Sequence, residues 1–278
     1  MSLYMRVLTR RGAAGLRICL AFMLSASAWA AVSGASAVRD TSYNDTKGEG
    51  KALVQELLTR MPPENSQILG LLKVRPPVGE IVEIPVRMTT RLVDDGWHEI
   101  YETQPVRTQP GEVFIVKHHG TAPSEYLFGR YKTVDEKPEL KPLKPDQLYR
   151  PLAGTDFYLV DLGLEFLHWP SQKIVKKEMR KSRSCRVVES INPKPSPGEY
   201  SRVLSWVDFE TSGIILAEAY DHNGELWKEF SIQKFDRKEK RLTEMEIYNV
   251  QTDSRTRLEL NFEVKTETAR EGARPPER

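Results

Sequence analysis

The chain lacks the residues that would give it disulfides or a membrane span. It has two cysteines in 278 residues, Cys19 and Cys185, and its most apolar run covers only residues 18–24. A transmembrane helix needs about 20 apolar residues in succession, so none is predicted. Cys19 lies in a predicted export leader, so Cys185 would be alone in the mature chain and could form no intramolecular disulfide. Stability must then come from the core.

Motifs of the common catalytic and metal-binding classes are also missing. There is no G-x-S-x-G, no glycine-rich phosphate loop, and no H-x-x-x-H or H-x-H among histidines 98, 118, 119, 168 and 222. Cys185 lies inside an apolar strand pattern, which indicates an inert buried thiol. Asp156, Asp161 and Glu165 fit the wet side of an amphipathic helix better than a carboxylate site. We therefore expect no enzyme, no metal and no cofactor.

The first thirty residues have the pattern of an export signal. Four arginines precede or flank the short apolar run, and Ala28-Trp29-Ala30 supplies small residues for cleavage. Residues 1–30 are predicted to be a signal peptide and 31–45 a flexible segment, and the mature protein is expected in the periplasm. Arg10-Arg11 leaves the choice between general and twin-arginine export open.

Without the predicted signal peptide, the chain has no strong excess of positive or negative charge. Without the four arginines of this peptide, 37 basic residues face 39 acidic ones. A nucleic-acid-binding surface would need clustered positive charge, so no nucleic-acid partner is expected.

Two helices and many strands follow. Thr46 and Glu49 have capping-box spacing before apolar residues at helical intervals, and Pro62-Pro63 ends that helix. Thr155 or Asp156 can cap a second helix that runs to His168. Residues 132–151, with four prolines, are predicted to be a surface loop, and 265–278 a disordered tail. Eleven strands are predicted from alternating apolar residues and turn signals, at 82–88, 97–103, 113–117, 126–131, 174–180, 185–192, 201–208, 214–220, 226–235, 242–250 and 255–264.

This pattern predicts a mainly β protein with two or more helices. Successive strands without a βαβ rhythm favour one strongly curved antiparallel sheet whose concave face is covered by the helices. A two-domain β-sandwich is the competing architecture.

The second half resembles a known family. Its pieces are Ala153-Gly154-Thr155-Asp156-Phe157, Cys185 to Glu189, Val203-Leu204-Ser205-Trp206-Val207-Asp208, Ala219-Tyr220-Asp221 and Glu244 to Val250. In this order they resemble the LolA-like outer-membrane lipoprotein-sorting family, over about 154–262 and more loosely over 82–103. The resemblance implies a LolA/LolB-like unclosed β-barrel over residues 46–264 with helices as a lid. It also implies an inner-strand arginine that ties the lid shut; Arg87 and Arg91 are candidates, although both fall in the outward register.

The resemblance implies a carrier of lipoproteins or lipid acyl chains, and the apolar face of the strands is the candidate cavity. Alternation selects Val82, Ile84, Val86, Met88, Trp97, Tyr101, Leu204, Trp206, Leu258, Leu260 and Phe262 as cavity residues, and Phe157, Val160, Leu164 and Leu167 as lid residues. The same side chains could instead form a packed core. The alternative function is therefore an envelope protein-interaction module without a ligand. In either case a monomer is expected, with envelope membrane proteins as further possible partners.

Overall fold

The computed structural model describes residue 45 and residues 48–106, 109–236 and 241–261. The predicted signal peptide, the predicted tail and Phe262 lie outside the described residues. The elements are α1 (Glu49–Thr59), β1 (Ser66–Arg75), β2 (Val82–Val93), β3 (Gly96–Thr103), β4 (Gly111–His119), β5 (Ala122–Tyr131), β6 (Lys141–Leu143), η1 (Pro145–Leu148), α2 (Leu159–Leu162), η2 (Glu165–His168), β7 (Ser171–Arg180), β8 (Arg183–Ile191), β9 (Tyr200–Asp208), β10 (Ile214–Asp221), β11 (Leu226–Asp236), β12 (Arg241–Asn249) and β13 (Ser254–Asn261).

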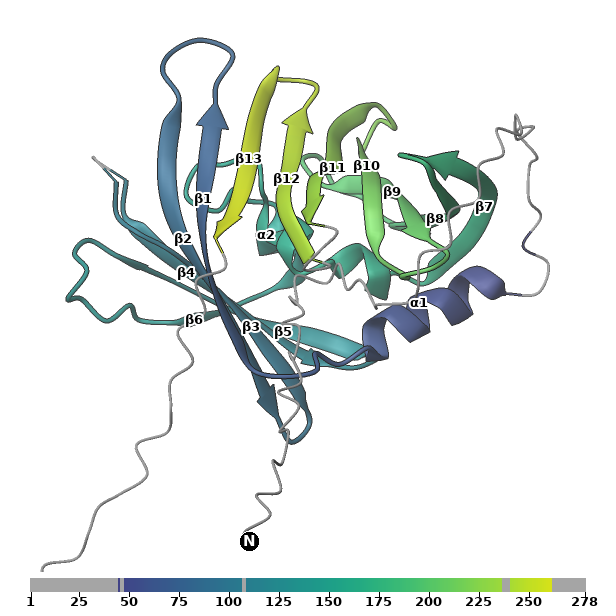
Figure 1. The fold of residues 1–278 in the computed structure, drawn as a ribbon, viewed down its shortest axis with the longest axis horizontal. Coiled ribbons are helices and arrows are strands. Elements are labelled where there is room, and N and C mark those ends of the chain that lie inside the picture. The colour runs from purple at the N-terminus through teal and green to yellow at the C-terminus, as the bar shows by residue number, and fades with distance from the viewer. Residues whose placement is uncertain (1–44, 46–47, 107–108, 237–240, 262–278) are drawn as a thin grey trace, which may run out of the picture.

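All thirteen strands belong to one antiparallel sheet. Their order is β6-β5-β4-β3-β2-β1-β13-β12-β11-β10-β9-β8-β7, so the early and late strands are joined where β1 pairs with β13. The end strands β6 and β7 do not pair with each other, and the sheet stays unclosed. Figure 1 shows it as one continuous curved wall, with α1 below β8–β10 and α2 behind β12. The predicted curved sheet is confirmed, and the two-domain sandwich is excluded.

Strand β1 was not predicted, because its apolar residues obscure the alternation. Ile68 and Leu72 are buried, yet Leu69 on the opposite face is also apolar and is 45% exposed. Gly70 permits the close packing of this strand between its neighbours, since a Cβ there would lie 3.0 Å from the Glu259 carbonyl oxygen. This strand is the link that makes the two halves a single sheet.

Helix α1 is capped by the side chain of Asp45, which precedes its first turn. The Asp45 carboxylate accepts hydrogen bonds from the backbone N–H groups of Glu49 and Gly50, each at 2.7 Å, and from that of Ile174 in β7 at 3.0 Å. Thr46 of the predicted capping box lies outside the described residues. Asp45 therefore stabilises the helix start and also attaches it to the edge strand β7.

The predicted inner face of β9 is wrong. Leu204 and Trp206 face away from the main core and pack with Cys185, Val187 and Ile215 in a second cluster. Val203 and Val207 belong to the main core instead. Trp206 is only 1% exposed, and the Lys176 ammonium and the Arg180 guanidinium lie 5.6 and 5.5 Å from its ring centre. Apolar residues on both faces of this strand removed the signal that would have set its register.

The segment before β7 is more broken than the sequence predicted. In place of one helix from Asp156 to His168, the chain forms the short helix α2 and the 3₁₀ turn η2. They are separated at Gly163, which ends α2, and at Leu164, whose φ of 48° is left-handed. The predicted loop 132–151 likewise contains β6 and η1, and Leu148 is fully buried. We call residues 151–169 the lid segment.

Candidate ligand site in the concave face

The lid segment fills the concave side of the sheet with apolar side chains. Phe157, Leu162, Leu164 and Phe166 are each 3–7% exposed and belong to the main core cluster. They come from four positions in a segment with little regular structure, and each points into the space that the curved strands enclose. The lid segment therefore occupies the position that a ligand in the concavity would need.

A small cavity remains between the lid segment and the strands, with a volume of about 50 Å³. An apolar cavity of about 150 Å³ takes one benzene ring, so this space is too small for an acyl chain. Its lining is mostly apolar and consists of Tyr101, Phe157, Asp161, Leu162, Leu164, Phe166, Tyr200, Val203, Ile214, Ala217, Ala219, Lys228, Phe230, Met245 and Ile247.

The predicted cavity and lid residues divide into groups. Tyr101, Phe157 and Leu164 line this space. Ile84, Val86, Met88, Leu258, Leu260, Val160 and Leu167 are buried in the same core cluster without lining it, and Val82 packs at the margin. Trp97 is buried beside His118, with ring centres 4.7 Å apart. Leu204 and Trp206 lie on the opposite face.

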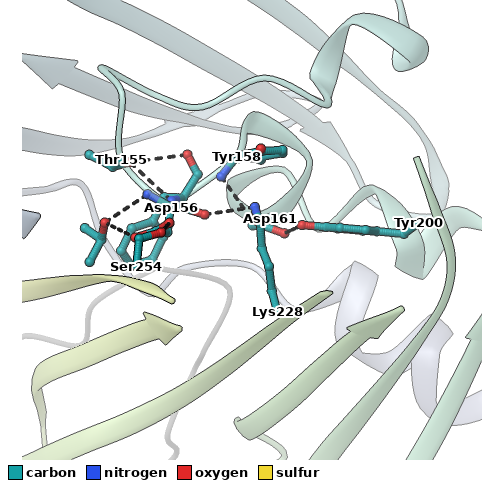
Figure 2. A network of polar contacts seen from close by, with 9 residues as sticks. Thr155, Asp156, Tyr158, Asp161, Tyr200, Lys228 and Ser254 are labelled. Carbon is teal, nitrogen blue, oxygen red and sulfur yellow. Dashed lines mark hydrogen bonds and ion pairs between the residues drawn. The ribbon is translucent and has the colours of Figure 1, made fainter. Parts of the chain in front are cut away.

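A buried lysine joins the lid segment to the sheet (Figure 2). The Lys228 ammonium of β11 donates to the backbone oxygen of Asp156 at 2.9 Å and to a carboxylate oxygen of Asp161 at 3.2 Å. It also lies 3.0 Å from the centre of the Tyr158 ring. Burial lowers the pKa of Lys228 to about 8, against the opposing effect of Asp161. Two oxygen acceptors and the Tyr158 ring offset part of the cost of burying this charge.

Asp161 connects this lysine to a second strand. The Tyr200 hydroxyl of β9 donates to the other Asp161 oxygen at 2.9 Å, and the backbone N–H of Tyr158 donates to the oxygen shared with Lys228 at 2.9 Å. Burial and the Asp161 charge raise the pKa of Tyr200 well above its usual value. The short helix α2 is thus held by polar contacts to β9 and β11.

Asp156 makes the corresponding contacts to β13. Its backbone N–H donates to the Thr256 hydroxyl at 2.9 Å, and the hydroxyls of Thr256 and Ser254 donate to its two carboxylate oxygens. These are charge-assisted hydrogen bonds in a buried setting, which are stronger than neutral ones. The start of the lid segment is therefore fixed to β13, in the middle of the sheet.

The other end of the lid segment meets β4 and β5. The Tyr126 hydroxyl donates to Glu165, whose pKa is raised because burial disfavours its charge. His168 lies 3.4 Å from the Ser124 hydroxyl, and burial together with His118 lowers its pKa to about 4. His168 is therefore neutral in the folded protein at neutral pH.

The sequence reading missed these polar contacts. The sequence pattern predicts Asp161 and Glu165 on the wet side of a helix, which is wrong because both face the sheet. Lys228 was not selected, although it alternates with the core residue Phe230 and so belongs to the inward face of β11. Arg87 forms an outward ion pair with Glu102 at 3.1 Å. Arg91 is exposed on the same side of its strand.

Within the ranges given above, no group of three or more His, Cys, Asp or Glu side chains could hold a metal ion. No helix of the described part of the chain is long and apolar enough to cross a membrane. The buried Cys185 thiol has its pKa raised to about 11, chiefly by desolvation.

The fold and the site define a class: an unclosed antiparallel β-barrel whose concave face is occupied by an irregular lid attached through buried polar contacts. Comparisons with solved structures place the fold among LolA-like proteins. A DUF1329 family protein from Desulfovibrio piger superposes with a TM-score of 0.63 at 14% identity, over 81% of this chain and 95% of that one. A domain described as an outer-membrane lipoprotein-sorting protein from Vibrio parahaemolyticus gives 0.63 at 19% identity, over 80% and 94%.

A LolA superfamily protein from Nitrosomonas europaea gives a TM-score of 0.53 at 16% identity, over 76% of this chain and 91% of that one. A family model described as an uncharacterized protein matches residues 137–270. No curated protein matches the chain. The predicted LolA-like resemblance is confirmed for the fold.

Proposed function

We propose that this protein binds acyl chains of lipids or lipoproteins in the periplasm, by exchanging its lid segment for the ligand. The observation that carries the proposal is the way the concavity is filled. An irregular segment with two left-handed or helix-ending positions, Gly163 and Leu164, supplies the apolar side chains. Regular helices would fill the same space with fewer strained positions.

The apolar contributions to this exchange are of similar size on both sides. Exposing four large apolar side chains of the lid segment costs about 1.5–3 kcal/mol each, or roughly 6–12 kcal/mol in total. Burying an acyl chain of about 14 carbons contributes about 0.8 kcal/mol per methylene, or roughly 11 kcal/mol. A single chain can therefore offset the loss of the buried apolar side chains, and the cost of breaking the polar contacts of the lid segment comes in addition.

The polar contacts of the lid segment favour a fully closed or a fully open segment over a partly open one. Lys228 on an inner strand holds the backbone oxygen of Asp156 and the side chain of Asp161. It occupies the role that the family resemblance implies for an inner-strand arginine. A buried ion pair is costly to form and costly to break, which favours a closed lid over a partly open one.

Binding accounts for the interior better than catalysis does. Ser124, His118 and Glu99 have the order of a nucleophile, a base and an acid, but their contacts are 3.5 and 3.6 Å. These are longer than the hydrogen bonds that activate a serine. The alternative of a packed interaction module is favoured by the small volume of the cavity, and the experiment below separates it from a carrier.

A photo-crosslinking residue at Leu164 tests the proposal. With vesicles of labelled phospholipid present, we expect capture of the acyl chain at this position. The control is the same probe at Leu204, which is half-buried on the opposite face and should capture no lipid. If the probe at Leu164 reacts only with the protein's own strands, the lid stays closed and the packed interaction module is the better account.

A further inference from the structure

Two hydrogen-bond donors of the sheet meet on one carboxylate of the lid segment. The Lys228 ammonium of β11 donates to one oxygen of Asp161 at 3.2 Å, and the Tyr200 hydroxyl of β9 donates to the other at 2.9 Å (Figure 2). We propose, on the basis of the lid exchange proposed above, that these two donors bind the carboxylate of a free fatty acid. In the closed state Asp161 then occupies the place of the ligand's head group.

Displacement of the lid segment removes the anions that hold the Lys228 charge. Both oxygens that its ammonium contacts, those of Asp156 and Asp161, belong to the lid segment. Burial lowers its pKa, and among the described residues the charges that oppose this effect are those of the same two side chains. The rings of Tyr200 and Trp227 remain, with centres 5.7 Å from the ammonium. A neutral ligand that filled the space would leave the buried ammonium with these rings alone, which offset only part of its desolvation.

Tyr200 needs an acceptor for a similar reason. Its side chain is fully buried, and its hydroxyl donates to Asp161. Burial, together with the Asp161 charge, raises the pKa of Tyr200 well above its usual value, so the hydroxyl keeps its proton and remains a donor. A carboxylate accepts hydrogen bonds at both of its oxygens. One carboxylate can therefore satisfy Lys228 and Tyr200 together, whereas an ester carries no charge.

An apolar path for the chain begins directly beside Lys228. Phe230 follows it on the same face of β11, about 6.6 Å along the strand, and Ile247 of β12 pairs with Phe230. Both apolar side chains are buried and line the same small cavity as Lys228, together with Met245. The carboxylate and the first methylene groups of one molecule can therefore contact Lys228 and Phe230 at the same time.

Attachment of the lid segment does not by itself require a buried lysine. Asp156 already accepts hydrogen bonds from the hydroxyls of Thr256 and Ser254 on β13. When both partners of a buried ion pair are replaced by apolar residues of similar volume, the result is often neutral or stabilising. A cation on the inner face is needed, by contrast, if the carboxylate of the lid segment and that of a ligand bind there in turn.

A fatty acid and its methyl ester test the head group separately from the chain. Equilibrium dialysis of the purified protein with radiolabelled dodecanoate or methyl dodecanoate at pH 7.5 gives the two dissociation constants. Both ligands must displace the same lid segment and bury the same chain, so these contributions cancel in the ratio of the constants. We expect the acid to bind about 30-fold more tightly, because only the acid forms charge-assisted hydrogen bonds with the two donors.

Variants of the two donors should reduce this preference. In Lys228→Met the ratio should fall to about 1, because the charge that distinguishes acid from ester is gone. Tyr200→Phe keeps the ring and should lower the ratio about 3-fold, since the hydroxyl can also donate to an ester carbonyl. Lys234→Met and Tyr248→Phe are the matched controls, because Lys234 is exposed and the Tyr248 hydroxyl donates to Asp253. Both should leave the ratio unchanged.

The outcomes separate the head group from the acyl-chain site. Equal binding of acid and ester by the unaltered protein would overturn the assignment of a fatty-acid carboxylate and leave the acyl-chain site intact. A preference for the acid that persists in full in Lys228→Met and Tyr200→Phe would overturn it as well. Binding of neither ligand would contradict the proposed function itself, and the assignment with it.

Discussion

Single buried polar residues decide whether the lid segment stays on the sheet. Lys228 is 2% exposed, and its ammonium depends on the oxygens of Asp156 and Asp161 that the lid segment supplies. Removing one member of a buried pair leaves an uncompensated charge, which costs more than the pair contributes when intact. The contacts of Lys228 should therefore dominate the opening of the lid segment.

Replacing Lys228 with methionine tests this directly. Lys228→Met keeps the length of the side chain but leaves Asp161 without its cation, so we expect a loss of about 3 kcal/mol in the free energy of unfolding. Amide hydrogen exchange in residues 151–169 should rise more than in the strands. Lys234→Met, on the same strand, is the control: this side chain is 71% exposed, and its partner Glu244 keeps an ion pair with Arg257 at 3.2 Å, so the change should cost under about 1 kcal/mol. Equal effects of the two changes would contradict a special role for Lys228.

His168 should make the lid segment sensitive to acid. Its pKa is about 4 in the folded protein and about 6.5 when unfolded. The unfolded state therefore takes up a proton first as the pH falls. The contribution of neutral His168 to the free energy of unfolding is fully present above pH 6.5. It is lost progressively as the pH falls towards 4, and the loss is about 2 kcal/mol at pH 5.

Urea unfolding at pH 7.5 and pH 5 measures this loss. His168→Gln removes the titrating ring, so the drop in stability between the two pH values should be smaller than in the unaltered protein by about 2 kcal/mol. A drop of the same size in both proteins would mean that other groups cause the acid sensitivity.

These residues also show where sequence patterns stop being informative. Alternation correctly puts Ile84, Val86 and Met88 on the buried side of β2, since one face is apolar and the other polar. It cannot reveal that Asp161 and Glu165 meet a lysine and a tyrosine from strands 67 and 39 positions away. Such pairings depend on tertiary contacts that neither local propensity nor spacing encodes.

Among the elements, the lid segment departs furthest from what local propensity predicts. Apolar residues at helical spacing suggested one helix from Asp156 to His168, but Gly163 ends α2 after one turn. Gly163 also lies against β5, because a Cβ at this position would be 2.8 Å from the Tyr126 ring. The glycine is needed for this close contact and does more than weaken a helix.

Gly163→Ala should therefore destabilise the protein, where helix propensity alone would predict the opposite. We expect a loss of about 1–3 kcal/mol from overpacking, measured by urea unfolding. In a Tyr126→Leu background the same change should cost clearly less, because the clashing ring atom is gone. A gain in stability in the Tyr126 protein would show that the segment relaxes freely at this point.

The strands divide into those with one wet face and those without. β2 and β13 alternate cleanly and were predicted. β1 was missed and β9 was assigned to the wrong face, since each carries large apolar residues on both sides. The outer cluster around Trp206 explains this for β9, because charged side chains cover apolar residues on the convex face. When both faces of a strand are apolar, the sequence does not show which face is directed to the main core.

At the scale of the molecule, the continuous sheet and the irregular lid segment differ in how many backbone hydrogen bonds hold them, and so in how easily each is expected to open. Twelve antiparallel strand pairings connect β6 to β7, whereas the lid segment has short helical turns and side-chain contacts at a few points. Opening is expected in the part with the fewest cooperative backbone contacts. The sequence predicted this division through its strand pattern and family resemblance, but not the contacts that keep the lid closed.

The identity of whatever fills the concavity tests the central claim most directly. Native mass spectrometry of the protein, purified from the periplasm without detergent, should show a population with added mass that organic extraction recovers as acyl lipid. In Lys228→Met, whose lid segment we expect to open more often, lipid exchange should be faster. A single unliganded mass in both proteins, with no lipid in the extract, would contradict an acyl-chain site and leave the concave face as a packed core.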